Sequence, residues 1–266
     1  MDVGELIFIG LGLHDEYGLS LRGQLEARSC DLLFAEFYTS RMPGLKLDGL
    51  ERLVGKKVNV LSRREVEEGA EETILSKAKT GRVGFLVPGD PLVATTHVDL
   101  RLRAVKSGVN SRIIHAASVV SASAGVTGLQ SYKFGRTTTV PVSLEGRFPM
   151  SVIETIASNL SSGLHSLVLL EIDVEHNQFV SIPTALKLLW ANSQQVPGVP
   201  ITDSTLVVGV ARLEARDMQV FAGRLVDVMR TEFGEPPYLL IFPGKLHFVE
   251  AEALQLICHA PKELVS

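Results

Sequence analysis

The sequence predicts an α/β protein made of two α/β domains. Short apolar runs alternate with longer amphipathic stretches, which is typical of strands and helices in a mostly parallel βαβ sheet. The length of 266 residues suits one large or two ordinary domains. A second series of alternating elements begins near Ala116. We therefore expect an N-terminal α/β domain at residues 1–115, with a mostly parallel sheet, and a C-terminal α/β domain at 116–266.

In the first domain, each expected strand is an apolar run that ends at a turn signal, and each expected helix has an apolar side. The helix at residues 19–30 has Ser20 as its cap and should bury Leu21, Leu25 and Ala27. The strongly charged stretch at 65–79 is predicted as one helix. The expected strands are 5–11, 32–37, 58–61, 83–87 and 111–115, and the expected helices are 19–30, 45–54, 65–79 and 97–107.

The second domain follows the same alternation. Its first helix, at residues 118–127, is rich in small residues, and Pro183 suits the first turn of a later helix. The expected strands are 137–142, 166–172, 205–211, 238–242 and a short extra one at 218–221; the expected helices are 118–127, 149–160, 183–190, 223–232 and 247–258.

The composition excludes several classes of protein. Hydrophobic residues make up 45% and charged residues 21%, and the net charge of -4 argues against a nucleic-acid partner. Cys30 and Cys258 have no metal-ligand spacing and are expected to be buried thiols. No apolar stretch is long enough to cross a bilayer. We expect a cytoplasmic enzyme without a metal site or a membrane partner.

The segment at residues 85–97 is the strongest candidate for a ligand loop. An apolar strand runs into Pro88-Gly89-Asp90-Pro91, and the next residues enter a helix. The two prolines restrict φ and Gly89 permits a tight turn, so the loop is stiff. Open α/β sheets bind ligands at the carboxyl ends of their strands. The alternative is a rigid turn that is capped by Thr96.

A second candidate is the turn Gly10-Leu11-Gly12 after the first strand, with Glu36 at the end of the second. This arrangement resembles the dinucleotide fingerprint, in which glycines let a pyrophosphate approach a helix N-terminus. The third glycine position is Asp15, whose carboxylate would repel a pyrophosphate. An NAD(P)-dependent oxidoreductase is therefore a disfavoured alternative. The turn either needs its glycines for conformation or faces a different ligand.

Hydrolase and metal sites have weaker support in the sequence. There is no Gly-x-Ser-x-Gly elbow, and the scattered histidines show no metal-ligand spacing. His165 and His176 lie near strand ends, where ordinary surface or core histidines are also found.

Five strings together resemble the diphthine synthase family, within the tetrapyrrole methylase superfamily. The first string and the PGDP core are common to the superfamily, whereas AEFYTS, VATTH and YKFG narrow the resemblance to this family. The similarity spans nearly the whole chain in the right order. The strings are FIGLGL (8–13), AEFYTS (35–40), PGDPLVATTH (88–97), TGLQSYKFG (127–135) and FPGKLHFVEAE (242–252).

The resemblance implies an S-adenosylmethionine-dependent methyltransferase, usually a homodimer, with two α/β domains of the tetrapyrrole methylase type and the cofactor in the cleft between them. Its protein substrate would be translation elongation factor 2. Such enzymes N-methylate the 3-amino-3-carboxypropyl arm on one histidine of the factor, three times in archaeal members to give diphthine; eukaryotic relatives add a methyl ester. The compact chain resembles the archaeal form. The same-fold alternative is a corrinoid-pathway methyltransferase.

The cofactor-binding positions of the family carry over to eight residues. Several are apolar, which fits recognition by backbone groups while side chains enclose the ligand. Relatives often have histidine where this chain has Tyr238. The resemblance assigns no catalytic residue: a carboxylate, a histidine or water could accept the amine proton, and neither His97 nor His165 is assigned. The cofactor positions are Leu13, Asp90, Val93, Ser118, Val119, Leu170, Leu213 and Tyr238.

Overall fold

The computed structural model describes residues 4–142, 148–196 and 201–265. The chain divides into two units, Met1–Val119 (unit 1) and Val120–Ser266 (unit 2). This division falls after Val119, whereas the sequence pattern placed the boundary after His115. Each unit has its own five-stranded sheet with helices packed against it.

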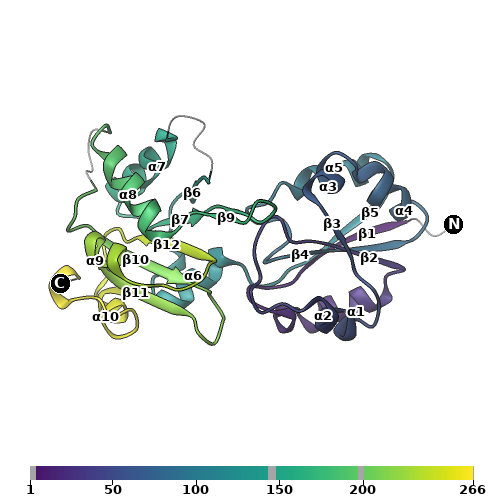
Figure 1. The fold of residues 1–266 in the computed structure, drawn as a ribbon, viewed down its shortest axis with the longest axis horizontal. Coiled ribbons are helices and arrows are strands. Elements are labelled where there is room, and N and C mark those ends of the chain that lie inside the picture. The colour runs from purple at the N-terminus through teal and green to yellow at the C-terminus, as the bar shows by residue number, and fades with distance from the viewer. Residues whose placement is uncertain (1–3, 143–147, 197–200, 266) are drawn as a thin grey trace. The chain divides into compact units, whose positions relative to one another are not determined.

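The sheet of unit 1 is entirely parallel and has the strand order β3-β2-β4-β1-β5. Helices α1 and α2 cover one face and α3 and α5 cover the other (Figure 1). Coverage on both faces explains why these strands are continuous apolar runs rather than alternating ones. The strands are β1 (Glu5–Gly10), β2 (Leu32–Glu36), β3 (Asn59–Leu61), β4 (Arg82–Val87) and β5 (Asn110–Ile114).

Strands β1 and β4 are neighbours, and the connections that follow them run in opposite directions across the sheet. After β1 the chain continues toward β2 by way of α1 (Leu21–Ser29), and after β4 it continues toward β5 by way of α5 (His97–Lys106), on the opposite face. This is a topological switch point, the place where open α/β sheets bind their ligands. The two glycine-containing loops of the sequence, 10–13 and 88–97, both begin here.

Helix α1 is present, but of its three predicted inward residues Ala27 is buried and the two leucines are exposed. Ser20 caps it, accepting a hydrogen bond from the Gly23 amide at 3.0 Å. Leu21 and Leu25 are 72% and 53% exposed, so their predicted burial was wrong. Ala27 is buried as predicted, and it shares the inner side of α1 with Gly23, whose small size also allows the helix to lie close to the sheet.

The stretch predicted as one helix at 65–79 is broken. Ser62 caps the five-residue helix α3 (Arg63–Glu67) through a capping box with Glu65. A π-helical turn, η2 (Glu71–Leu75), and the short α4 (Ser76–Ala78) follow. A periodicity of 3.6 residues cannot anticipate the wider turn of a π-helix. The remaining long helix of unit 1 is α2 (Leu47–Val54).

The sheet of unit 2 is mixed, with the strand order β11-β10-β12-β7-β6. Only β6 and β7 pair in parallel, and the other three pairs are antiparallel. The strands are β6 (Thr138–Val140), β7 (Ser166–Leu170), β10 (Leu206–Ala211), β11 (Gln219–Arg224) and β12 (Tyr238–Phe242), and a small hairpin that the sequence did not predict consists of β8 (Ile172–Asp173) and β9 (Gln178–Phe179).

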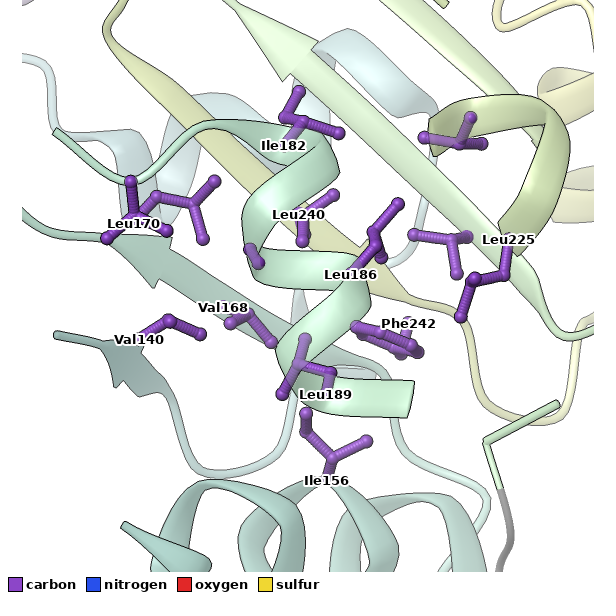
Figure 2. Close-up of a cluster of buried hydrophobic side chains, with 14 of the residues drawn as sticks. Val140, Ile156, Val168, Leu170, Ile182, Leu186, Leu189, Leu225, Leu240 and Phe242 are labelled. Carbon is purple, nitrogen blue, oxygen red and sulfur yellow. The ribbon is translucent and has the colours of Figure 1, made fainter. Parts of the chain in front are cut away.

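The largest buried cluster of unit 2 lies between its sheet and three helices. Figure 2 shows Leu186 and Leu189 of α8 beside Val168 and Phe242 of the sheet, and all four side chains are fully buried. Each buried side chain of this size stabilises the fold by about 1.5–3 kcal/mol. The helices of unit 2 are α6 (Val119–Thr127), α7 (Met150–Ser161), α8 (Ile182–Ser193), α9 (Leu225–Arg230) and α10 (Phe248–Leu256), with 3₁₀ turns η3 (Ser131–Lys133) and η4 (Lys262–Leu264). α6 begins at the last residue of unit 1.

Candidate functional site

The turn after β1 and the loop after β4 are joined through their main chains. The Gly89 amide donates to the Gly12 carbonyl at 2.7 Å, and the Gly12 amide donates to the Gly89 carbonyl at 3.3 Å. Both glycines have left-handed φ angles, +81° at Gly12 and +69° at Gly89, a region that glycine occupies without strain. The two loops therefore form one surface at the switch point.

Glycine is required at this junction for space as well as conformation. A β-carbon on Gly10 would lie 2.6 Å from the Gly89 carbonyl oxygen and 2.7 Å from the β-carbon of Ala116. At Gly89, by contrast, the nearest atom to such a carbon would be the Ala117 oxygen at 4.0 Å. Three backbone segments thus converge here and leave an open position at Gly89, where a ligand can approach the main chain closely.

Asp15, the residue that departs from the dinucleotide fingerprint, caps a short turn. Its Oδ1 accepts a hydrogen bond from the Tyr17 amide at 3.0 Å, at the start of the 3₁₀ turn η1 (Glu16–Gly18). A carboxylate therefore occupies the position where a pyrophosphate-binding glycine would stand.

His97 fixes the loop that follows β4. Its Nδ1 lies 3.2 Å from the Pro91 carbonyl oxygen, which can only accept, so Nδ1 carries the proton. Its Nε2 then accepts from the Tyr38 hydroxyl at 3.3 Å. Between these anchors Ala94 adopts a left-handed φ of 56°, a conformation that non-glycine residues seldom take.

Glu36 completes this buried cluster. Its carboxylate is fully buried and accepts hydrogen bonds from the Tyr38 and Thr39 amides at 2.9 and 3.0 Å. Burial raises the pKa of Glu36, although the donors from Thr39 and Tyr38 oppose that effect. Burial also lowers the pKa of His97 to about 4, so its 3.8 Å approach to Glu36 is not an ion pair at neutral pH. The strings at 35–40 and 88–97 therefore form one buried cluster.

Asp90 lies at the end of the joined loops with its carboxylate almost buried. Its Oδ2 is 2.7 Å from Nδ1 of His115 and accepts from the Ala116 amide at 3.4 Å. Its Oδ1 accepts from the Leu92 amide at 3.4 Å. The carboxylate is thus directed at the segment after β5, and no sequence pattern predicted this contact with His115.

The other predicted residues of unit 1 lie along the same segments. Leu13 directly follows the Gly12 turn and is half-buried, and Val93 lies in the joined loop and is partly exposed. Ser118, which is buried, and Val119 follow the segment that Asp90 contacts.

The three predicted residues of unit 2 lie together where the inner strands of its sheet begin or end. Tyr238, the first residue of β12, pairs with Ala211 at the end of β10, and the next residue of β12 pairs with Leu169. Leu170 and Leu213 therefore lie near Tyr238, and both side chains are buried. A ligand contact at these two leucines would come from their main chains.

The Tyr238 side chain packs within unit 2. Its hydroxyl donates to the Gly234 carbonyl, and its ring centroid lies 6.0 Å from that of Phe179 in β9. The hydroxyl helps to hold the turn before β12, which fits a main-chain contact with the ligand at this position.

Arg212 shapes the loop that carries Leu213, and no sequence pattern pointed to it. It is buried and has a left-handed φ of 50°. Its guanidinium donates to the Glu235 carbonyl at 2.6 Å, to the Asp217 carbonyl at 2.8 Å and to the Asp217 carboxylate at 2.7 Å. One buried side chain thus ties the end of β10 to the turn before β12.

The strings at 127–135 and 242–252 meet in a second buried network. Nδ1 of His165 accepts from the Gly244 amide at 2.9 Å, so its Nε2 carries the proton and donates to Glu250 at 2.9 Å. Lys133 forms an ion pair with the same carboxylate. Ser166 pairs with Phe242, the last residue of β12, so the network adjoins the end of this strand that is opposite to Tyr238.

This network holds its histidine neutral and its glutamate charged. Burial lowers the pKa of His165, although the bond to Glu250 opposes that effect. Burial alone would raise the pKa of Glu250, but hydrogen bonds from the His247 amide, Lys133, the Gln130 amide and His165 outweigh it and bring the pKa to about 2. His165 therefore has a structural role here.

A pocket of about 170 Å³ lies against α7, and none of the eight predicted residues lines it. It is smaller than the roughly 300–1,000 Å³ typical of small-molecule sites. Its lining residues are Arg136, Ser151, Glu154, Thr155, Ser158 and Asn159.

Within the described ranges, no three His, Cys, Asp or Glu side chains are grouped so that they could hold a metal ion. None of the helices described is both long and apolar enough to cross a membrane.

We predict that His97→Gln flattens the pH dependence of stability. The pKa of His97 is 6.5 when unfolded and about 4 when folded, so the unfolded chain binds the extra proton between these values. The stabilisation is complete above pH 6.5 and declines as the pH falls toward 4, by about 3 kcal/mol. Glutamine retains a donor for Pro91 but does not titrate. Urea unfolding across this pH range should show a shallower slope for the variant; identical slopes would contradict the assignment.

Glu250→Gln should lower the free energy of unfolding by about 3 kcal/mol or more, since breaking a buried ion pair leaves Lys133 without its counter-charge. The matched control is Glu252→Gln, which changes an exposed carboxylate on the same helix and should have little effect. Urea unfolding of both variants at neutral pH measures the difference. Equal stability of the two would show that the network does not hold unit 2 together.

The comparisons with known proteins agree with this architecture. The family model described as Tetrapyrrole (Corrin/Porphyrin) Methylases matches residues 5–222. The diphthine synthase of Methanosarcina mazei is 45% identical over 265 residues, covering 98% of both chains. That of Methanothermobacter thermautotrophicus is 40% identical, again over 98% of both. A crystal structure of diphthine synthase superposes with a TM-score of 0.87 at 35% identity, covering 98% of each chain.

The matches to the diphthine synthases extend over nearly the full length of the chain. The chain belongs to the tetrapyrrole methylase family and, within it, to the diphthine synthases.

Proposed function

We propose that this methyltransferase uses S-adenosylmethionine to N-methylate, three times, the 3-amino-3-carboxypropyl arm on a histidine of translation elongation factor 2, giving diphthine. The observation that carries the proposal is the main-chain junction of Gly12 and Gly89. It joins two strings typical of the family at the switch point of a parallel sheet, in a chain that is 45% identical to a diphthine synthase.

The residues present fit the cofactor. The open position at Gly89 lets a ligand approach the main chain, and the buried leucines of unit 2, Leu170 and Leu213, supply apolar residues at the proposed site. Adenine is largely apolar on its faces and hydrogen-bonds at its rim, which such surroundings suit. The residues proposed to hold the cofactor are Leu13, Asp90, Val93, Ser118 and Val119 in unit 1 and Leu170, Leu213 and Tyr238 in unit 2.

The chemistry demands little of the protein beyond placement. When bound, S-adenosylmethionine supplies a methyl group that its sulfonium already makes electrophilic. The protein has to hold the substrate amine in line with that group and in its neutral form. Positioning of this kind can contribute about 7–11 kcal/mol to lowering the barrier. Stiff loops such as 88–97, fixed by His97 at both ring nitrogens, suit that task.

The remaining features of the proposal follow from the family. The chain would act as a homodimer in the cytoplasm, with elongation factor 2 as its protein partner and no nucleic-acid or membrane partner. Its net charge of -4 fits a protein rather than a polyanion as substrate.

The direct test is to incubate the enzyme with methyl-labelled S-adenosylmethionine and elongation factor 2 that bears the unmethylated arm. We expect up to three labelled methyl groups on that histidine, counted by mass spectrometry. Elongation factor without the arm serves as the matched control and should stay unlabelled. Binding of the cofactor without any labelling of the armed factor would refute the proposal, and labelling of a precorrin instead would indicate a corrinoid-pathway enzyme.

A further inference from the structure

His115 lies beside the proposed cofactor loop and has one hydrogen-bond partner among the described residues. It directly follows β5, at the same carboxyl edge of the sheet as the loops after β1 and β4. Its Nδ1 lies 2.7 Å from Oδ2 of Asp90. The imidazole side chain is 72% exposed, whereas the carboxylate it contacts is 8% exposed. A buried carboxylate thus holds an imidazole that faces solvent.

The partners of Asp90 determine which ring nitrogen carries the proton. Oδ2 also accepts a hydrogen bond from the Ala116 amide, and Oδ1 accepts one from the Leu92 amide. With the carboxylate acting as acceptor throughout, Nδ1 of His115 is the donor. The lone pair of the neutral ring then lies on Nε2 of a side chain that is mostly exposed. A histidine that donates Nδ1–H to a carboxylate in this way can act as a general base through Nε2.

The proposed reaction requires such a base. An alkyl amine is mostly protonated near neutral pH, and an ammonium has no lone pair with which to accept a methyl group. One proton must leave the nitrogen before each transfer. Building on the function proposed above, we propose that His115 is the catalytic proton acceptor and that Asp90 orients it.

The step balances as follows. The ammonium nitrogen of the arm gives a proton to Nε2 of His115 and keeps the electron pair of the broken N–H bond. That pair forms the new bond to the cofactor's methyl carbon, while the pair of the broken C–S bond stays on sulfur. The imidazolium is stabilised by Asp90 through its Nδ1–H and returns its proton to water, since the ring is exposed. Three such cycles release three protons and leave a trimethylammonium group.

The other histidines of unit 1 do not suit this role. His97 is buried and uses both ring nitrogens, one with the Pro91 carbonyl and one with Tyr38. Nδ1 of His14 is buried, and its ring packs against Gly44 so closely that a β-carbon there would lie 2.5 Å from Nε2. His115 therefore combines an exposed Nε2 with a carboxylate partner in the loop proposed to hold the cofactor.

The test replaces His115 with asparagine and compares the variant with His259→Asn, which removes another exposed histidine, one that lies beyond α10. We expect His115→Asn to lower methyl transfer to the armed elongation factor by about 10²- to 10⁴-fold, the usual contribution of a general base. Its dissociation constant for S-adenosylmethionine, from calorimetry, should stay within about twofold of wild type. Added imidazole should restore part of the lost rate. His259→Asn should behave as wild type.

A second readout does not depend on turnover. Long-range ¹H–¹⁵N NMR of the wild-type protein, without cofactor or substrate, should show His115 as the Nδ1–H tautomer. In Asp90→Asn the population should shift toward Nε2–H, because the carboxylate that selects the tautomer is gone.

Three results would overturn the inference. Methyl transfer at the wild-type rate by His115→Asn would do so, as would a loss that imidazole does not restore and that parallels weaker cofactor binding, which would indicate a structural role. An Nε2–H tautomer in the wild-type protein would also contradict it. Absence of methyl transfer by the wild-type enzyme overturns the proposed function together with this inference, whereas equal transfer by wild type and variant overturns the inference alone.

Discussion

The main-chain pairing of Gly12 with Gly89 is the constraint on which the site of unit 1 depends. It holds two loops together at the switch point and leaves no space for a side chain at Gly10. Because main-chain groups form the junction, the side chains around it can make other contacts. His97 holds the far end of the loop, and Asp90 reaches across to the segment after β5. The result is a stiff loop whose polar groups have defined orientations.

Each unit contains a cluster of buried polar groups, and the two clusters differ in their charge state. In unit 1, His97 is neutral and its contact with Glu36 is not ionic near neutral pH. In unit 2, the Glu250 carboxylate stays charged because several donors compensate for its burial. Both arrangements join segments that are far apart in the sequence, and both involve strings by which the family can be identified. These strings therefore have structural roles in buried clusters. Among them, the loop after β4 is the one that carries residues of the proposed ligand site.

Much of the fold was predictable because apolar runs and turn residues are local signals. The parallel strands of unit 1 and the loop at 88–97 follow from them, and the resemblance supplied the cofactor positions that no local pattern indicates. Local signals failed where tertiary packing decides. Helix α1 buries Ala27 as predicted but leaves Leu21 and Leu25 exposed, and a π-helical turn interrupts the helix predicted at 65–79. The partners of Asp90, Glu36 and Glu250 could not be found from the sequence, since each pairing depends on how distant strands line up.

Hydrogen–deuterium exchange with and without S-adenosylmethionine tests the central claim most directly, because it locates the cofactor on the chain without requiring turnover. We expect the cofactor to protect main-chain amides in peptides that cover residues 10–13 and 88–93, beside the Gly12–Gly89 junction. Protection confined to the α7 segment around the small pocket at Ser151 and Glu154, with no change at the junction, would contradict it.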